Sequence, residues 1–409
     1  MAAVFFGLAG DGLAAYFTPD DMMNLYGAWF RPLIEQERPL GALVYRAIYA
    51  GFGLNPLPYR VVCFGLLAGN LVLLYAVAAR LSSSRTVAAL ACLLGAYHAH
   101  LADLYYNTGT VYDLLCFALY WGAALAWMRG RPWGALALYA GALLSKEMAV
   151  TLPAVLAVYE IAQGRRAAWL RLLPMVVVTA AFLLHTALRP ESVAAYVPHF
   201  SWRTMMENWS NYGSDLFYGA FHLTAGRILL LWAIVAAAAA LLRTPDAVVA
   251  AVVIWVGLLP VVFIAPRGFY VMYLTLPGWY VLAARVLERA TRRVHPAAVF
   301  ALLAVMLVPL HAARREKGRW WVREAQASVR AVLEPLRRES LPKGARVLFV
   351  ADPYPENDFL LTFIFRMRFR DDGILVERAR TRPPDAWAYD RIYRVSGDGP
   401  LNWHLQKGE

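Results

Sequence analysis

Long apolar stretches recur over positions 1–313 and are separated by short polar connections. A stretch of roughly 17 to 25 apolar residues is long enough, at about 1.5 Å per helical residue, to cross the hydrocarbon core of a bilayer. The pattern therefore predicts a polytopic α-helical membrane protein with about eleven transmembrane helices. They are expected near residues 1–17, 59–79, 86–102, 112–128, 132–145, 148–163, 168–188, 223–242, 246–264, 270–287 and 296–313.

The pattern changes after the last apolar stretch. A basic run covers residues 314–338, and the apolar segment Arg346–Val350 ends before Asp352-Pro353 and is typical of a strand. Apolar residues at helical spacing follow in 358–368, and further strands are expected at 374–376 and 391–395. We therefore expect two domains, a membrane domain over 1–313 and a small extracytoplasmic α/β domain over 314–409.

Arginine residues predict the orientation, because short cytoplasmic loops carry Lys and Arg in excess. Every second connection is basic, through Arg80, Arg85, Arg129, Arg131, Arg165, Arg166, Arg171, Arg243, Arg289, Arg292 and Arg293. The opposite, extracytoplasmic side then receives the long first loop 18–58, the loop 189–222 and the C-terminal domain. Arginine is used far more than lysine, which favours a GC-rich bacterial source and a bacterial inner membrane.

Composition agrees with a membrane protein, since 60% of the residues are hydrophobic and 17% are charged. The formal net charge of +12 follows in part from topology, and no motif for binding nucleic acid accompanies it. Cys63, Cys92 and Cys116 all lie in predicted spans without metal-ligand spacing. No small-residue cleavage site precedes Asp20, so we do not expect the first apolar segment to be a cleaved signal peptide.

An acidic pair, Asp20-Asp21, follows the first predicted span. Thr18-Pro19 before it predicts a helix start, with Thr as N-cap, Pro at the first position and acids in the first turn. Capping accounts for one acid, and acids beside apolar spans are typical of functional sites. The helical stretches that follow are apolar and aromatic, as expected of helices in the plane of the membrane interface.

Further polar residues belong to the same side. His98, His100 and Asp103 precede Asp113 at the head of the next span. The histidines allow either a metal site or, more commonly, a hydrogen-bonded structural cluster. Ser145-Lys146-Glu147 forms a hairpin tip, where the lysine is either an anchor paired with Glu147 or a point charge for a phosphate.

These residues together resemble the GT-C glycosyltransferases, most closely the protein O-mannosyltransferases and the tetratricopeptide-linked group with its bacterial relatives. The likeness rests on Asp20-Asp21, Arg38-Pro39-Leu40, Gly51-Phe52-Gly53-Leu54 and Ser145-Lys146-Glu147 with Thr151-Leu152-Pro153. His98, Asp103 and Asp113 fit that group's second loop, although Val111 stands where the group has an arginine. The resemblance is best over positions 1–160 and implies transfer of mannose or another hexose or pentose from a polyprenyl phosphate.

Inverting transfer from a lipid phosphate requires a base for the acceptor hydroxyl and cations for the phosphate leaving group. We expect Asp20 to be the catalytic base, with Asp21 beside it. Asp103 and Asp113 are expected to orient the acceptor or to hold a divalent cation such as Mg, Mn or Zn. The candidate ligands of that cation are Asp21 and Asp103. Lys146 and Arg267 would bind the donor phosphate, with Glu147 and His98 in support. Trp202, Trp209 and Tyr212 would stack on sugar or lipid, or belong to an interfacial aromatic belt.

The expected partners are a polyprenyl-phosphate sugar, membrane lipid, and an acceptor that is a protein, lipid or glycan. A secondary transporter or a lipid flippase without glycosyl transfer is the alternative. Transporters place charges near mid-membrane in repeated halves, whereas the acids and Lys146 lie at span ends and no internal repeat is visible. A membrane scaffold without catalysis ranks last.

Overall fold

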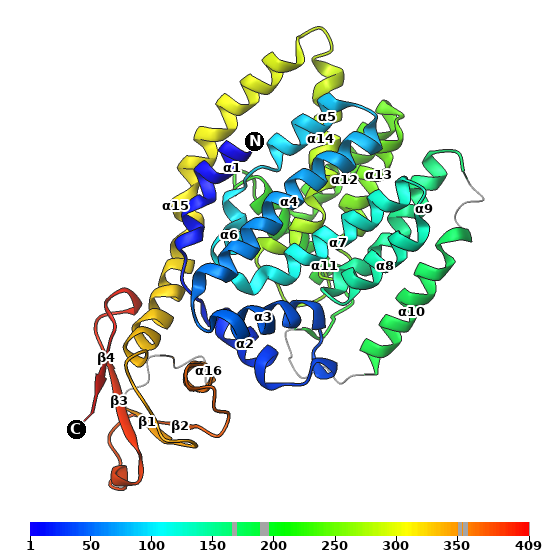
Figure 1. Cartoon of the computed structure of the whole chain (residues 1–409). Helices are drawn as coiled ribbons and strands as arrows, with labels where there is room; N and C mark the ends of the chain where they lie inside the picture. Colours follow the sequence, from blue (N-terminus) through cyan, green and yellow to red (C-terminus); the bar gives the residue numbers. More distant parts are fainter. Residues whose placement is uncertain (166–169, 189–195, 351–353, 355–358, 409) are drawn as a thin grey trace. The chain divides into compact units, whose positions relative to one another are not determined.

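The computed structural model describes residues 1–165, 170–188, 196–350, 354 and 359–408 (Figure 1). Arg166, the first part of the predicted loop 189–222 and Asp352-Pro353 lie outside these residues. The described α-helices are α1 (Ala2–Ala9), α2 (Pro19–Phe30), α3 (Pro39–Phe52), α4 (Pro56–Ser82), α5 (Arg85–Leu94), α6 (Ala102–Tyr106), α7 (Val111–Met128), α8 (Pro132–Leu143), α9 (Leu152–Ala162), α10 (Leu173–Ala187), α11 (Trp202–Leu216), α12 (Ala225–Leu242), α13 (Pro245–Val256), α14 (Leu276–Ala290), α15 (Pro296–Leu336) and α16 (Leu360–Phe369).

Proline begins many of these helices. It occupies one of the first two positions of α2, α3, α8, α9, α10, α13 and α14. The first N–H groups of a helix have no partner within it, so a proline there loses no hydrogen bond and its fixed φ suits the helix. The sequence thus marks the start of each of these helices, including α2 with the acidic pair.

Five helical stretches among the described residues are long and apolar enough to cross a membrane: Pro56–Ser82, Thr108–Met128, Leu170–Ala187, Ala225–Leu242 and Pro296–Lys317. A sixth arises if Arg85–Leu94 and Ala99–Tyr106, which are bent by 66°, form one span. These coincide with six of the predicted spans. The others correspond to the shorter helices α1, α8, α9, α13 and α14, whose crossing of the membrane stays a prediction.

Residue contacts divide the chain into two compact units. The helical unit consists of Met1–Gly10, Gly65–Leu101 and Tyr112–Glu316, and the mixed unit of Asp11–Phe64, Ala102–Val111 and Lys317–Glu409. The first outer loop therefore groups with the C-terminal residues. Helix α15 continues through residue 314, where the sequence pattern had placed the domain boundary, to Leu336.

In the helical unit, α14 packs on α5 and α13, and α13 also packs on α9 and α12. Gly278 permits the close approach of α14 to α13, because a Cβ there would lie 2.8 Å from the carbonyl oxygen of Ala250. Helix α11 packs on α12 and lies inside the stretch predicted to be a loop. An outer connection between two spans can contain a helix, and here the buried Met206, Trp209 and Tyr212 follow a helical period.

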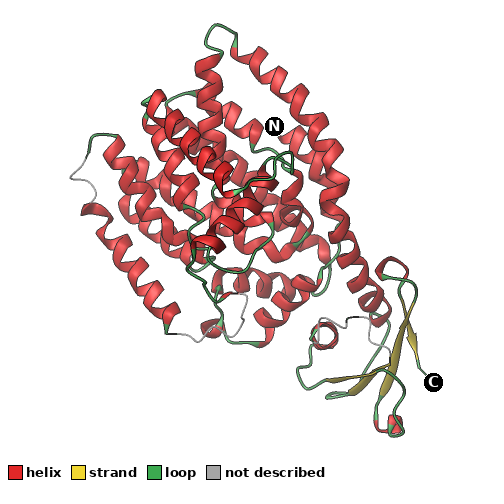
Figure 2. Ribbon diagram, turned by 180° about the vertical axis from the view of Figure 1, so that it is seen from behind, coloured by secondary structure: helices red, strands yellow, loops and turns green. Residues whose placement is uncertain are grey.

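The mixed unit contains the four-stranded sheet, which Figure 2 shows in yellow. Strands β1 (Arg346–Val350), β2 (Leu375–Ala379), β3 (Arg391–Ser396) and β4 (His404–Lys407) are arranged in the order β2-β1-β3-β4. β1 pairs in parallel with β2 and β3, and β3 pairs antiparallel with β4. The three predicted strands and the predicted helix, α16, are confirmed, and β4 was missed.

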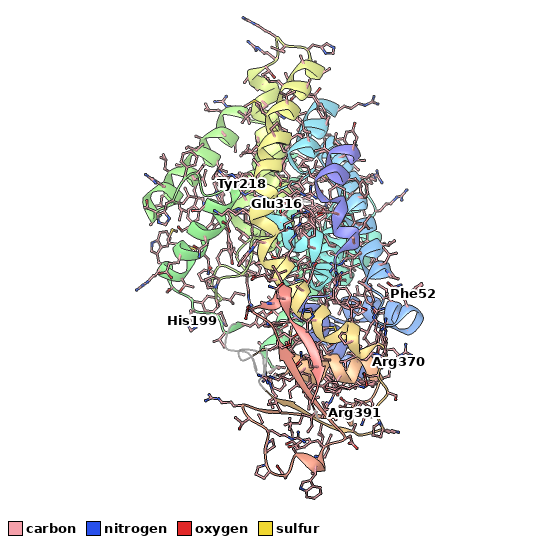
Figure 3. All side chains as sticks on the ribbon, turned by 90° about the vertical axis from the view of Figure 1, so that its left-hand side faces the viewer. Phe52, His199, Tyr218, Glu316, Arg370 and Arg391 are labelled. Carbon is pink, nitrogen blue, oxygen red and sulfur yellow. The ribbon has the colours of Figure 1, made fainter. Side chains whose placement is uncertain are left out.

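Helix α16 connects the sheet to the first outer loop within this unit, because it packs on α2. The ring of Tyr26 stacks on Phe363 with centroids 4.6 Å apart, and its hydroxyl donates to Asp372. Arg370, labelled in Figure 3, lies over the rings of Trp29 and Tyr49. Aromatic and cation–π contacts thus hold together two segments that are far apart in sequence.

Candidate active site

The acidic pair lies at the start of α2, as predicted, and its two carboxylates have different environments. Thr18 is the N-cap: its Oγ1 accepts from the Asp21 N–H at 3.3 Å, while Asp21 Oδ2 accepts from the Thr18 N–H at 2.8 Å. This reciprocal pair is a capping box. It accounts for Asp21, which is fully buried, and leaves Asp20 exposed beside it.

Asp21 faces a buried arginine on α4. Arg60 donates to the carbonyl oxygens of Ala15 at 3.3 Å and Tyr16 at 2.5 Å, and its guanidinium lies 3.5 Å from Asp21 Oδ2. Burial raises the pKa of Asp21 to about 6, against the lowering effect of Arg60. Oδ1 is buried and has no hydrogen-bond partner among the residues that the structure describes. Asp21 therefore carries its charge only in part near pH 6.

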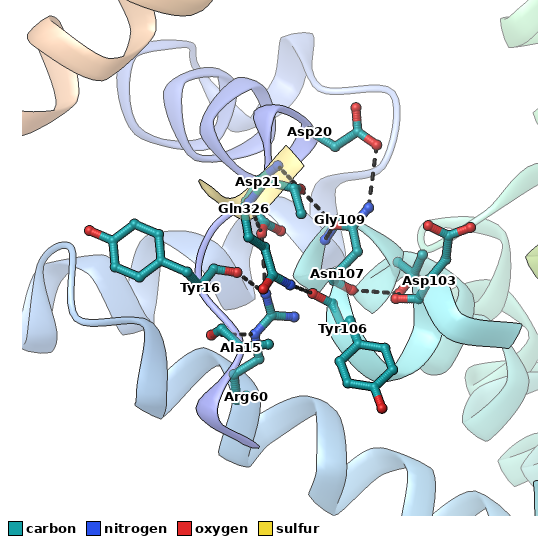
Figure 4. A network of polar contacts seen from close by, with 12 residues as sticks. Ala15, Tyr16, Asp20, Asp21, Arg60, Asp103, Tyr106, Asn107, Gly109 and Gln326 are labelled. Carbon is teal, nitrogen blue, oxygen red and sulfur yellow. Dashed lines mark hydrogen bonds and ion pairs between the residues drawn. The ribbon is translucent and has the colours of Figure 1, made fainter. Parts of the chain in front are cut away.

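Asn107 connects Asp20 to the cap (Figure 4). Its Nδ2 donates to Asp20 Oδ2 at 3.3 Å, and its Oδ1 accepts from the Thr18 hydroxyl at 3.1 Å and from the Gly109 N–H at 2.7 Å. A Cβ on Gly109 would lie 3.2 Å from Asp20 Cβ, so the loop approaches the helix closely there. Asn107 thus orients an exposed carboxylate without burying it.

Asp103 belongs to the same unit and is buried on α6. Its carbonyl oxygen accepts from the Asn107 N–H at 2.8 Å, which places the predicted acid next to the residue that holds Asp20. The roles of Arg60 and Asn107 were not predicted from the sequence. A lone arginine near the start of the apolar Pro56–Ser82 was the available signal, since a charge within an apolar span requires a partner.

Lys146 lies in the helical unit, where its Nζ donates to Asp113 Oδ1 at 2.5 Å. Both side chains are buried, and Nζ is 4.9 Å from the centroid of the Tyr270 ring. Asp113, which we expected to orient the acceptor or a cation, is thus the ion-pair partner of the predicted phosphate-binding lysine. Glu147 begins the 3-10 turn that follows Lys146.

Arg267 belongs to the same unit and is half-buried. Its guanidinium lies 4.0 Å above the ring of Tyr196, and its backbone N–H donates to the Tyr212 hydroxyl at 3.2 Å. A guanidinium packed on an aromatic ring keeps its positive charge, which suits an interaction with a phosphate.

His98 is buried between the rings of Tyr218 and Phe269, with centroids 4.3 Å and 4.8 Å away (Tyr218 is labelled in Figure 3). Its Nε2 lies 3.2 Å from the carbonyl oxygen of Leu216. His100 instead pairs with Asp215 at 3.2 Å. These contacts favour the structural interpretation of the histidines over metal binding.

The three aromatic candidates on α11 differ in exposure. Trp202 is 58% exposed, whereas Trp209 and Tyr212 are buried. The Trp209 ring packs edge-on against Trp232, and Tyr212 bonds to the backbone of Arg267. Of these three, Trp202 is therefore the side chain that is accessible to a ligand, and Trp209 and Tyr212 pack in the core of the helical unit.

The predicted divalent cation requires carboxylate oxygens that are directed toward it. Asp21 does not fit, because it is fully buried and shares its Oδ2 with a guanidinium. Among the described residues, no three His, Cys, Asp or Glu side chains converge as a metal site would require. The cation stays a prediction from sequence, and no step below depends on it.

Two groups of predicted residues therefore exist. In the mixed unit Asn107 donates to Asp20 and is joined to Asp21 through Thr18 and to Asp103 through the backbone. In the helical unit, which also contains Arg267 and His98, Lys146 pairs with Asp113. Each group combines a carboxylate with a hydrogen-bonding or cationic partner. The first provides a candidate base, and the second provides candidate cations for a phosphate.

Comparisons with known proteins give the fold. No family model matches the chain, and no curated protein sequence matches it. The solved structure of ArnT from Cupriavidus metallidurans bound to undecaprenyl phosphate is similar, with a TM-score of 0.55 and 15% identity over 96% of this chain and 91% of that one. The structure of ArnT from Cupriavidus metallidurans in the apo state gives a TM-score of 0.55 and 14% identity, and the match covers 96% of this chain and 92% of that one. This chain therefore has the fold of these ArnT structures.

Proposed function

We propose that this protein transfers a sugar from a polyprenyl-phosphate donor to an acceptor hydroxyl on the extracytoplasmic side of the membrane, with inversion at the anomeric carbon. The observation that carries the proposal is the exposed carboxylate of Asp20, held by Asn107 at the start of α2, in a chain that shares its fold with a protein crystallised with undecaprenyl phosphate.

In the proposed reaction Asp20 accepts the proton of the acceptor hydroxyl. The hydroxyl oxygen bonds to the anomeric carbon while the bond from that carbon to the phosphate oxygen breaks, and polyprenyl phosphate leaves with the electron pair. A carboxylate suits this step because it is exposed to the acceptor and fixed in orientation. Asn107 and Thr18 are positioning residues, since they reach the acceptor only through Asp20.

Lys146 and Arg267 are proposed to bind the donor phosphate. Lys146 supplies a compact charge that Asp113 balances when no donor is present. Arg267 supplies planar N–H donors fixed on the Tyr196 ring. Stabilising the leaving phosphate lowers the barrier to bond cleavage, because negative charge develops there in the transition state.

The test measures transfer of labelled sugar from a panel of polyprenyl phosphates to candidate acceptors by purified protein. We expect Asp20→Asn to lower turnover about 10² to 10⁴-fold, the range for removal of a general base, with donor binding unchanged. Lys146→Gln should weaken donor binding. Asp385→Asn, at an exposed acid elsewhere in the mixed unit, is the matched control. Unchanged turnover in Asp20→Asn would refute the assignment of the base.

A further inference from the structure

A pocket of about 660 Å³ lies in the mixed unit, outside the carboxylate cluster. Its walls come from three segments: residues 14–16 before α2, the part of α15 from Trp320 to Ala331, and residues 400–403 between β3 and β4. This volume is typical of sites for a ligand of one to three sugar rings or a comparable small molecule. No proposed catalytic step uses it.

The lining combines aromatic rings with charged and amide groups. Tyr16, Trp320 and Trp403 contribute the rings. Arg323 and Arg330 contribute two guanidiniums against the one carboxylate of Glu324, and Gln326 adds an amide. The rings of Trp320 and Trp403 suit the C–H faces of a sugar, whereas the buried Tyr16 ring lies beneath Arg330. An excess of guanidinium over carboxylate favours an anion. Glu324 and Gln326 provide acceptors for sugar hydroxyls.

Several of these groups are fixed in place. The Arg330 guanidinium lies 4.7 Å over the Tyr16 ring. Gln326 donates to the carbonyl oxygen of Tyr106 at 2.7 Å, one residue before Asn107, and the carbonyl oxygen of Tyr16 accepts from Arg60 (Figure 4). The pocket walls therefore share backbone segments with the network around Asp20 and Asp21.

We propose that this pocket binds a sugar ring that carries an anionic group, either a carboxylate or a phosphate. Binding of such a ligand is a claim about the pocket alone. A second claim, that this ligand is the acceptor saccharide, rests on the proposed function. It is suggested by the backbone segments that the pocket walls share with the network around Asp20.

The test is calorimetric titration of the full-length protein in detergent with tri-galacturonic acid, glucose 6-phosphate, maltotriose and inorganic phosphate. We expect one or both anionic sugars to bind, and the two neutral or sugar-free probes to bind at least about tenfold more weakly, because each lacks one half of the recognised group. The two anionic sugars distinguish a carboxylate from a phosphate ligand.

Arg330→Gln and Trp403→Ala should each weaken binding about tenfold or more. Arg338→Gln and Trp387→Ala, at exposed positions outside the lining, are matched controls that should not. Equal binding of maltotriose and the anionic sugars, or unchanged binding in both pocket variants, would overturn the proposal. Titration of Asp20→Asn tests whether binding in the pocket is independent of the base. If the anionic sugars bind but the wild type transfers no sugar, the proposed function is refuted and the proposal for the pocket stands.

Discussion

The ion pair of Asp21 with Arg60 in the mixed unit and that of Asp113 with Lys146 in the helical unit are built differently. Arg60 divides its donors between two backbone carbonyl oxygens and Asp21, whereas Lys146 donates to a single carboxylate oxygen of Asp113. A guanidinium with several fixed acceptors stabilises local structure, and an ammonium on a flexible stem can change its partner. From this difference we expect Arg60 to hold the fold around the acidic pair and propose Lys146 as the cation that a ligand recruits.

Substituting each cation by methionine should separate these roles and gives the largest expected effect. Arg60→Met leaves Asp21 and two carbonyl oxygens without their donor in a buried place, so the free energy of unfolding should fall by about 3 to 5 kcal/mol. Lys146→Met should cost about 1 to 3 kcal/mol, because it removes the donor of one carboxylate oxygen and leaves no backbone carbonyl oxygen without a partner. Chemical unfolding in detergent micelles measures both.

A second mutation sharpens this contrast. Asp113→Asn added to Lys146→Met removes the carboxylate that the lysine balanced, so stability should recover while donor binding stays weak. Asp21→Asn added to Arg60→Met should recover less, since the carbonyl oxygens of Ala15 and Tyr16 still lack a donor. Equal costs and equal recovery in the two units would show that the pairs are equivalent.

The sequence predicted local features more fully than their assembly. Thr18-Pro19 marked the cap of α2, and the apolar run Arg346–Val350 marked β1, because short-range patterns fix helix starts and strands. The cations and carboxylates that pair in the two units are distant in sequence, so their pairing depends on how helices pack. Residue type alone suggested Glu147 for Lys146, and tertiary packing instead brought Asp113.

The grouping of the first outer loop with the C-terminal residues was also beyond the sequence pattern. Hydropathy divides a chain at the end of its last apolar stretch, and α15 shows no break there because its polar half continues the same helix. The contact between Tyr26 and Phe363 joins segments that hydropathy assigned to separate domains. Aromatic residues on an amphipathic helix indicate that a partner exists and do not say which one.

The pH dependence of stability provides the next test. The pKa of Asp21 is about 6 in the folded protein, against 3.8 as its ordinary value, so the folded state binds more protons between these values. The contribution of Asp21 to stability is therefore full below about pH 4 and is lost as the pH rises through 6, by up to about 3 kcal/mol at 1.36 kcal/mol per pH unit. Thermal unfolding between pH 4 and 8 measures this, and Asp21→Asn should flatten the curve. The prediction would be contradicted if the stability of the wild type rose from pH 4 to 6 and Asp21→Asn had the same pH dependence.

Helix caps give the smallest and most selective comparison. Thr18 caps α2 in the mixed unit, and Ser201 caps α11 in the helical unit by accepting from the Thr204 N–H at 3.0 Å. Thr18→Ala and Ser201→Ala should each cost about 1 kcal/mol in the free energy of unfolding. Only Thr18→Ala should also lower turnover several-fold, because the Thr18 hydroxyl donates to the amide oxygen of Asn107 and so fixes the group that orients Asp20. A matched loss of stability with unchanged turnover in both variants would mean that Asn107 orients Asp20 without help from the cap, and that the capping box serves the helix alone.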